Sequence, residues 1–357
     1  MNRREFLSLG AVAGVAAAAG CAASVDARTG PTPRSSSAKP AKALMKLGCQ
    51  RFGAKDDCLQ YYARYGVQYI AAGPDGPWTA ENIRAARERA KAYGIDIVAT
   101  HIGAGNVLLE EGEQREKSIK QFCEQIRIGA DGGYSALFYG LGIPVGVPSR
   151  TEPTPGRGKV SYSTFDLAKV PPGPDLPTPV SAKLVWDRIA YFLDRVVPVA
   201  EKCKLHLACH PQDPPLPDGF RGAGHALSTV EGLKRFVSIA DSDYHGLHFC
   251  QGTVSEMLEN PGKEIYDVIR WFGIRKKIVN VHFRNLRGKH DSFYETYPDE
   301  GDVDMLRAMR VYKEVGYDRT MMPDHLPGHP DDPTQCEGFA FAYGYIRALI
   351  QAVAAEG

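Results

Sequence analysis

Eight short apolar runs, separated by amphipathic stretches, constrain the fold of this chain more than any other feature. The apolar runs cover residues 44–50, 68–72, 95–101, 135–139, 205–210, 246–250, 278–283 and 320–324. Between them, apolar residues recur at the i, i+3, i+4 spacing of a helix face, most clearly in 80–93, 113–129, 184–203, 229–239 and 303–315. Strands that alternate with helices form parallel sheets, and eight even units favour closure into a (β/α)₈ TIM barrel over an open doubly wound sheet.

One long segment interrupts this alternation. Residues 141–182 are rich in glycine, proline, serine and arginine, and they follow the fourth predicted strand. A segment at that place lies over the face of the barrel where the carboxyl ends of the strands meet, and long loops in compact domains are commonly lids or binding loops. We therefore predict a lid, with a disordered insertion as the alternative.

The first residues have the pattern of an export signal followed by a tether. Residues 1–21 hold an Arg-Arg pair, an Ala- and Gly-rich apolar run and small residues directly before Cys21. This pattern resembles a twin-arginine signal peptide with a lipoprotein cleavage site, at which Cys21 is acylated. Residues 22–42 are rich in Ser, Pro, Lys and Ala and predict a flexible linker, so the barrel domain is expected at 43–357. We predict an exported protein, periplasmic or membrane-anchored, that meets the membrane only through its lipid.

The charge balance narrows the class of partner. The chain has 43 basic and 42 acidic residues, a net charge of +1. Proteins that bind nucleic acid carry a basic excess, so no nucleic-acid partner is expected. A small molecule is the expected ligand. Barrels of this kind often pair, which makes a homodimer the assembly to test.

Good metal ligands end four successive predicted strands. His210, Cys250, His282 and Asp324 stand at or next to the ends of strands five to eight. Taken singly, such a histidine is more often hydrogen-bonded, such a cysteine buried and such an aspartate a turn residue. In a parallel barrel, however, these ends converge on one mouth, where active sites lie. Nitrogen, thiolate and carboxylate ligands together indicate a borderline divalent ion such as Mn²⁺, Fe²⁺, Co²⁺ or Zn²⁺.

Further polar residues are predicted to surround this mouth. Arg284 lies two residues after His282, on the same face of an extended strand, and its guanidinium can hold a substrate carboxylate with two hydrogen bonds. His325 is next to Asp324 and is a candidate proton carrier. His101 ends the third predicted strand, where it is either a hydrogen-bonded rim histidine or a substrate-binding group.

The second half of the chain resembles the mannonate dehydratase family. The matching segments are 196–215, 249–253, 281–284, 301–305 and 322–325, with weaker agreement at 162–169 and in the rest of 44–350. The sequence departs from the family pattern at Gln212, where an acidic residue is more usual, and in the Leu-Pro inserted between His325 and Gly328. An export signal is also unusual for an enzyme of intracellular hexuronate breakdown.

The resemblance implies a hydro-lyase that converts D-mannonate into 2-dehydro-3-deoxy-D-gluconate and water. It places the metal ligands on His210, Cys250, His282 and Asp324, and implies Mn²⁺ or Fe²⁺ as the ion. It also implies a functional tyrosine near the chain end, for which Tyr343 is the better match; the alternative is a residue that packs the closing helix on the barrel.

The reaction requires loss of a proton from the carbon next to a carboxylate and departure of the neighbouring hydroxyl. A divalent metal and Arg284 would stabilise the negative charge that develops. His325 and Tyr343 are the predicted acid and base, in either order. Two other functions are considered: a sugar isomerase or epimerase of the xylose-isomerase-like class, and a lipoprotein that binds sugar acids without catalysis.

Overall fold

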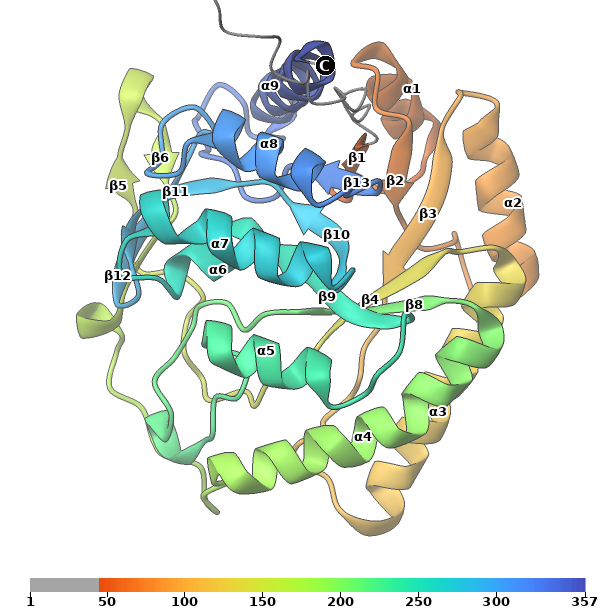
Figure 1. Cartoon of the computed structure of the whole chain (residues 1–357), viewed down its shortest axis with the longest axis vertical. Helices are drawn as coiled ribbons and strands as arrows, with labels where there is room; N and C mark the ends of the chain where they lie inside the picture. The colour runs from red at the N-terminus through yellow and green to blue at the C-terminus, as the bar shows by residue number, and fades with distance from the viewer. Residues whose placement is uncertain (1–44, 357) are drawn as a thin grey trace, which may run out of the picture. The chain divides into compact units, whose positions relative to one another are not determined.

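The computed structural model describes residues 45–356, and these form a closed parallel barrel surrounded by helices (Figure 1). The predicted signal peptide at 1–21 and linker at 22–42 lie outside the described residues. The barrel strands are β1 (Lys46–Cys49), β2 (Tyr69–Ala71), β3 (Asp96–His101), β4 (Ala136–Gly140), β8 (His206–His210), β9 (His245–Cys250), β10 (Ile278–His282) and β13 (Thr320–Met322). All neighbouring pairs are parallel, and β13 pairs with β1 to close the ring. The predicted TIM barrel is therefore confirmed.

Helices follow the strands and cover the outside of the barrel. They are α1 (Asp56–Arg64), α2 (Ala80–Lys91), α3 (Gly112–Gly132), α4 (Ala182–Cys203), α5 (Val230–Ser238), α6 (Gln251–Glu256), α7 (Pro261–Ile274), α8 (Met305–Glu314) and α9 (Cys336–Ala355). Side-chain oxygens of Thr79, Ser181, Thr229 and Asp304 accept hydrogen bonds from free backbone N–H groups at the starts of α2, α4, α5 and α8. Local sequence thus sets where these helices begin.

Each barrel strand sends alternate side chains inward and outward. The outward side chains pack with the helices in the main hydrophobic core, whereas the inner layer is small: Ala71, Ala99, Ala136, Phe138, Ala208, Val279 and Met322. β9 shows the alternation with two buried histidines. His245 faces outward and its Nε2 lies 3.0 Å from the carbonyl oxygen of Phe236 in α5, while the ring of His248 contacts that of His282 inside the barrel.

The long segment after β4 is folded, and it joins a small sheet. It contains β5 (Thr154–Pro155), η1 (Arg157–Lys159), β6 (Ser161–Tyr162), β7 (Thr164–Asp166) and η2 (Leu167–Lys169). β7 pairs antiparallel with β12 (Ser292–Thr296), which in turn pairs with β11 (Asn285–Lys289). Because β11 directly follows β10, this sheet is attached at the carboxyl end of the barrel, as the predicted lid requires. A further short helix, η3 (Phe220–Gly222), follows β8.

Helix α9 closes the chain against the barrel. Of the described helices it is long and apolar enough to cross a membrane, judged by length and composition alone. One face, which includes Phe339, Ala342 and Ile346, is buried in the main core. That burial is what a barrel's closing helix requires.

Candidate active site

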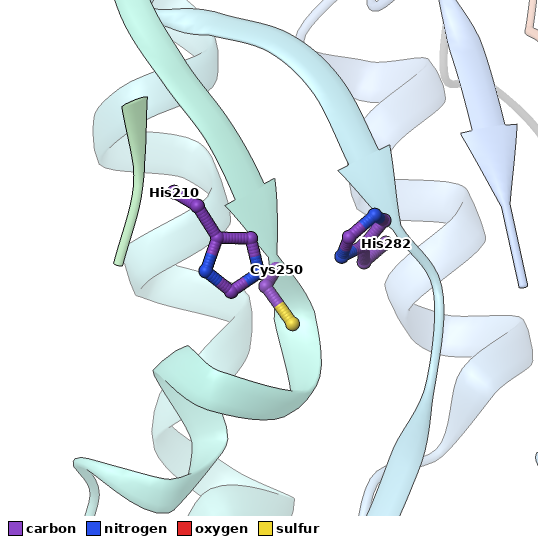
Figure 2. Close-up of side chains that lie close together, drawn as sticks. All are labelled: His210, Cys250 and His282. Carbon is purple, nitrogen blue, oxygen red and sulfur yellow. The ribbon is translucent and has the colours of Figure 1, made fainter. Parts of the chain in front are cut away.

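Three of the four predicted metal ligands meet at the carboxyl ends of adjacent strands. His210 ends β8, Cys250 ends β9 and His282 ends β10, and the Cα atoms of Cys250 and His282 are direct partners in the sheet register. One ligand atom from each residue lies within 4.8 Å of the other two (Figure 2). Parallel strands in register therefore bring residues far apart in sequence to one point.

Asp324, the fourth predicted ligand, lies beside this group. It follows β13 by two residues, and its Oδ2 is 3.3 Å from Nδ1 of His282 and 3.8 Å from Sγ of Cys250. The carboxylate is buried, and the nearby His282 and His325 hold its pKa well below the usual range against the effect of burial. A carboxylate with a lowered pKa therefore lies next to two of the three grouped residues.

The chemistry of these side chains fits a divalent metal ion. His282 is almost fully buried, yet neither of its ring nitrogens has a hydrogen-bond partner among the described residues. Nδ1 of His210 lies 2.6 Å from the carbonyl oxygen of Pro211, which leaves Nε2 for a metal, as is usual for histidine ligands. Burial raises the pKa of the Cys250 thiol, but the guanidinium of Arg284 and the nearby rings of His210 and His282 outweigh it, so the pKa is well below the usual range. A thiolate is the form that binds metal.

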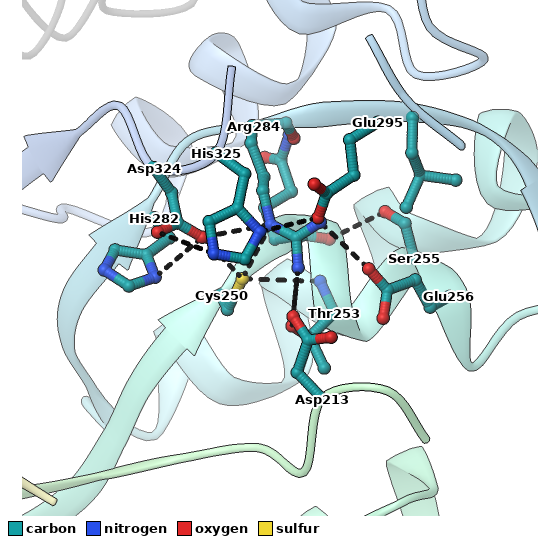
Figure 3. A network of polar contacts seen from close by, with 12 residues as sticks. Asp213, Cys250, Thr253, Ser255, Glu256, His282, Arg284, Glu295, Asp324 and His325 are labelled. Carbon is teal, nitrogen blue, oxygen red and sulfur yellow. Dashed lines mark hydrogen bonds and ion pairs between the residues drawn. The ribbon is translucent and has the colours of Figure 1, made fainter. Parts of the chain in front are cut away.

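Arg284 does not offer the free guanidinium that was predicted for a substrate carboxylate. Its side chain is 1% exposed, and all of its N–H groups are engaged (Figure 3). Nε lies 3.3 Å from Sγ of Cys250 and 3.1 Å from Oδ2 of Asp324. The terminal nitrogens donate to Glu256, Glu295, Asp213 and Thr253. Arg284 therefore neutralises the anions around the metal site instead of facing the substrate.

His325, the predicted proton carrier, is held by a carboxylate. Its side chain is 49% exposed, and its Nδ1 lies 2.7 Å from Oε1 of Glu295. Burial lowers the pKa of His325, but Asp324 and Glu295 raise it by more, to about 9. Because Glu295 holds Nδ1, Nε2 is the ring nitrogen without a hydrogen-bond partner among the described residues.

Several residues of this site were missed by the sequence analysis. Arg150 comes from the segment after β4; it bonds both oxygens of Asp213, at 2.7 and 3.2 Å, contacts Glu295, and lies 3.3 Å from Nδ1 of His325. Glu256 is the last residue of α6, the helix that begins directly after Cys250. Glu295 lies on β12 and is 1% exposed. The only available signal was an acidic residue within an alternating, strand-like stretch.

A second group, Asp213, Glu295 and His325, also has the spacing of a metal site. Its two carboxylates already pair with the guanidinium groups of Arg150 and Arg284. A second cation there would face two fixed positive charges, so we interpret this group as a hydrogen-bonding network around His325.

Tyr343 and His101 have contrasting positions. Tyr343 is fully buried in α9; its hydroxyl donates to Sγ of Cys49, and its ring packs near Tyr61 and Phe339 in the core between barrel and helices. The structure therefore gives it the alternative role, packing of the closing helix, and does not bring it to His325.

His101 is exposed at the end of β3, with its ring 5.5 Å from that of His248. The loss of water around its ring and the nearby His282 and His210 lower its pKa to about 4.

Known relatives resemble this chain in sequence. The mannonate dehydratase of Thermotoga petrophila is 36% identical over 149 residues, 41% of this chain, and the chain spans 40% of that protein's length. The mannonate dehydratase of Streptococcus pneumoniae is 25% identical over 341 residues, with 85% of this chain and 91% of that protein covered.

Solved structures show the same fold. The mannonate dehydratase of Streptococcus suis serotype 2 superposes with a TM-score of 0.77 at 23% identity, covering 87% of this chain and 94% of that one. A xylose isomerase domain protein from Planctomyces limnophilus superposes with a TM-score of 0.59 at 14% identity, covering 87% and 99%.

The family model for D-mannonate dehydratase (UxuA) matches residues 166–355, a range that includes all four predicted metal ligands. This match covers more than half of the 357 residues. The chain therefore belongs to the D-mannonate dehydratase family.

Proposed function

We propose that this protein is a metal-dependent hydro-lyase that removes water from D-mannonate and yields 2-dehydro-3-deoxy-D-gluconate. The observation that carries the proposal is the convergence of His210, Cys250 and His282, with Asp324 beside them, at the carboxyl end of a closed barrel. A site that combines a thiolate, two imidazoles and a carboxylate beside an exposed histidine suits removal of a proton next to a carboxylate.

His210, Cys250, His282 and Asp324 would hold the metal, for which we propose Mn²⁺ or Fe²⁺. When bound, the metal supplies positive charge that stabilises the anion formed next to the substrate carboxylate. A pure oxygen cage would indicate Mg²⁺ or Ca²⁺, whereas the thiolate at Cys250 favours a softer ion.

His325 would transfer the proton at its Nε2. Glu295 accepts a hydrogen bond from Nδ1 of His325 and so fixes the orientation of the ring, as an orienting carboxylate does in other general acid–base sites. Since the side chain of Tyr343 points from α9 into the core, where its hydroxyl donates to Cys49, we assign it no proton transfer.

The substrate would approach from the side on which His325 and His101 are exposed. We propose that His101 contacts the substrate hydroxyl groups, because it is an exposed polar ring at the mouth of the barrel. Arg150, whose side chain is 14% exposed, lies 3.3 Å from Nδ1 of His325 and is a cation close to this approach.

A turnover assay on a panel of aldonates tests the function. The metal-free protein would be reconstituted with Mn²⁺ without air, and product read as a 2-keto-3-deoxy acid, with Cys250→Ser as control. Product from D-mannonate that disappears in the control supports the lyase. A product that keeps the substrate's formula would indicate an isomerase or epimerase, and bound sugar acid without turnover would indicate a binding lipoprotein.

A further inference from the structure

A fifth histidine, absent from the four of the predicted site, packs against the proposed metal centre. His248 is on β9, two residues before Cys250, so both side chains point to the inside of the barrel. Its side chain is 0% exposed. Below it lies the apolar inner layer, where the ring of Phe138 is 4.2 Å from that of His248.

His248 contacts both histidines proposed as metal ligands. Its ring centroid is 3.9 Å from that of His282, with an interplanar angle of 66°, and 5.4 Å from that of His210, with an angle of 77°. These are edge-to-face arrangements, which are directional and restrict how a ring can turn. Since the nitrogens of His282 have no hydrogen-bond partner among the described residues, ring packing and Asp324 are what fix its direction.

A short chain of hydrogen bonds holds His248 itself. In the orientation of the Asn280 amide that satisfies its neighbours, Oδ1 accepts from Nε2 of His248 at 2.9 Å and Nδ2 donates to Thr320. Nε2 of His248 therefore carries the proton, and Nδ1, which has no partner among the described residues, keeps its lone pair. One tautomer and one ring orientation are thus specified by β10 and β13.

We propose that His248 is a positioning residue of the metal centre: clamped by Asn280, it holds the rings of His282 and His210 in the direction that metal binding needs. The inference rests on the proposed metal centre. A histidine that merely filled space would affect folding, whereas a positioning residue affects how tightly and with what geometry the metal is bound.

The test measures binding of Co²⁺ alone to the full chain, by calorimetry and by the thiolate-to-cobalt absorption band. The variants are His248→Phe, which keeps a ring but loses the bond to Asn280, and Asn280→Ala, which releases the clamp. His245→Phe is the matched control, because His245 is equally buried on the same strand but faces α5.

We expect both site variants to bind Co²⁺ about 10- to 100-fold more weakly, with a shifted band, and the control to bind as the wild type does. The double variant should lose no more than either single one, because the two residues act as a unit. If His248→Phe does not fold, Asn280→Ala decides. Wild-type affinity and spectrum in the folded variants, equal loss in the control, or no Co²⁺ binding by the wild type would overturn the inference. Weakened binding in a protein that never dehydrates mannonate would keep it and refute only the proposed reaction.

Discussion

Arg284 shows how one buried side chain can hold a site together. It is the cation nearest to Cys250 and is paired with the carboxylates of Asp213, Glu256, Glu295 and Asp324. Burial raises the pKa of Glu256 well above the usual range, whereas Arg284 and Arg150 outweigh burial and lower the pKa of Asp213. The guanidinium groups of Arg284 and Arg150 therefore favour the charged form of Asp213, whereas burial favours the neutral form of Glu256.

Replacing Arg284 should be costly for stability. In Arg284→Met several buried carboxylates lose their cation, and we expect the free energy of unfolding to fall by about 3–5 kcal/mol. Urea titration followed by circular dichroism measures this. The control is Arg310→Met, which removes an exposed pair with Glu356 and should change stability by at most about 1 kcal/mol. Equal losses of unfolding free energy in both variants would show that the buried ion pairs contribute no more to stability than the exposed pair.

His325 should matter for turnover and not for metal content. We expect His325→Gln to lower kcat about 10²- to 10⁴-fold, because a general acid–base group is lost while the four proposed ligands remain. Turnover and bound metal would be measured on the same sample. His290→Gln serves as control, since His290 lies on the hairpin between β11 and β12, and its side chain has a polar partner only in its neighbour Asp291 among the described residues. Near-normal turnover in His325→Gln with full metal would remove His325 from the mechanism.

The junction of β9 and α6 couples the metal site to the backbone. Cys250 ends the strand and also caps the helix, because its Sγ accepts a hydrogen bond from the N–H of Thr253. Gly252, in the first turn, passes so close to Arg284 that an added Cβ would lie 2.5 Å from its Nε. The turn is therefore built around the guanidinium.

Gly252→Ala should displace Arg284 and loosen the site. We expect a loss of about 1–3 kcal/mol in unfolding free energy, as for overpacking of a core, together with weaker Co²⁺ binding. Gly344→Ala in α9 is the matched control, because an added Cβ there meets nothing within 4 Å. It should stabilise the helix by roughly 0.5–1 kcal/mol. A Gly252→Ala protein with wild-type stability and metal affinity would contradict this packing argument.

The same elements show how far sequence reasoning reaches. The eight strands and the residues that end them follow from periodicity, and strand ends in a parallel barrel converge whatever lies between them, so His210, Cys250, His282 and Asp324 could be predicted together. The six-residue helix α6 and strand β12 are too short to give a periodic signal. The contacts of Arg150, Glu256 and Glu295 depend on how separate loops meet, and Tyr343 was placed by resemblance without knowledge of the helix face it occupies.

Ion pairs are distributed unevenly over the described part of the chain. Although the net charge is +1, buried ion pairs are concentrated at the carboxyl end of the barrel, and most other pairs are partly or fully exposed. The barrel thus has an apolar core, and the three-stranded sheet of β7, β11 and β12 contributes Glu295 to the candidate site at the carboxyl ends of the strands.

This organisation fits export in the folded state, which we propose from the Arg-Arg pair and Cys21. A twin-arginine route carries folded proteins, so the metal could be bound and Cys250 buried before the chain meets an oxidising compartment. We expect the wild type in the membrane fraction, Cys21→Ser in the soluble periplasmic fraction, and Arg3→Lys with Arg4→Lys retained in the cytoplasm. Immunoblots of cell fractions distinguish these outcomes, with Cys58→Ser as a control because Cys58 lies in the barrel domain. If all four proteins were found in the cytoplasm, the N-terminal segment would not be an export signal, and folding before export would play no part in protecting the thiolate.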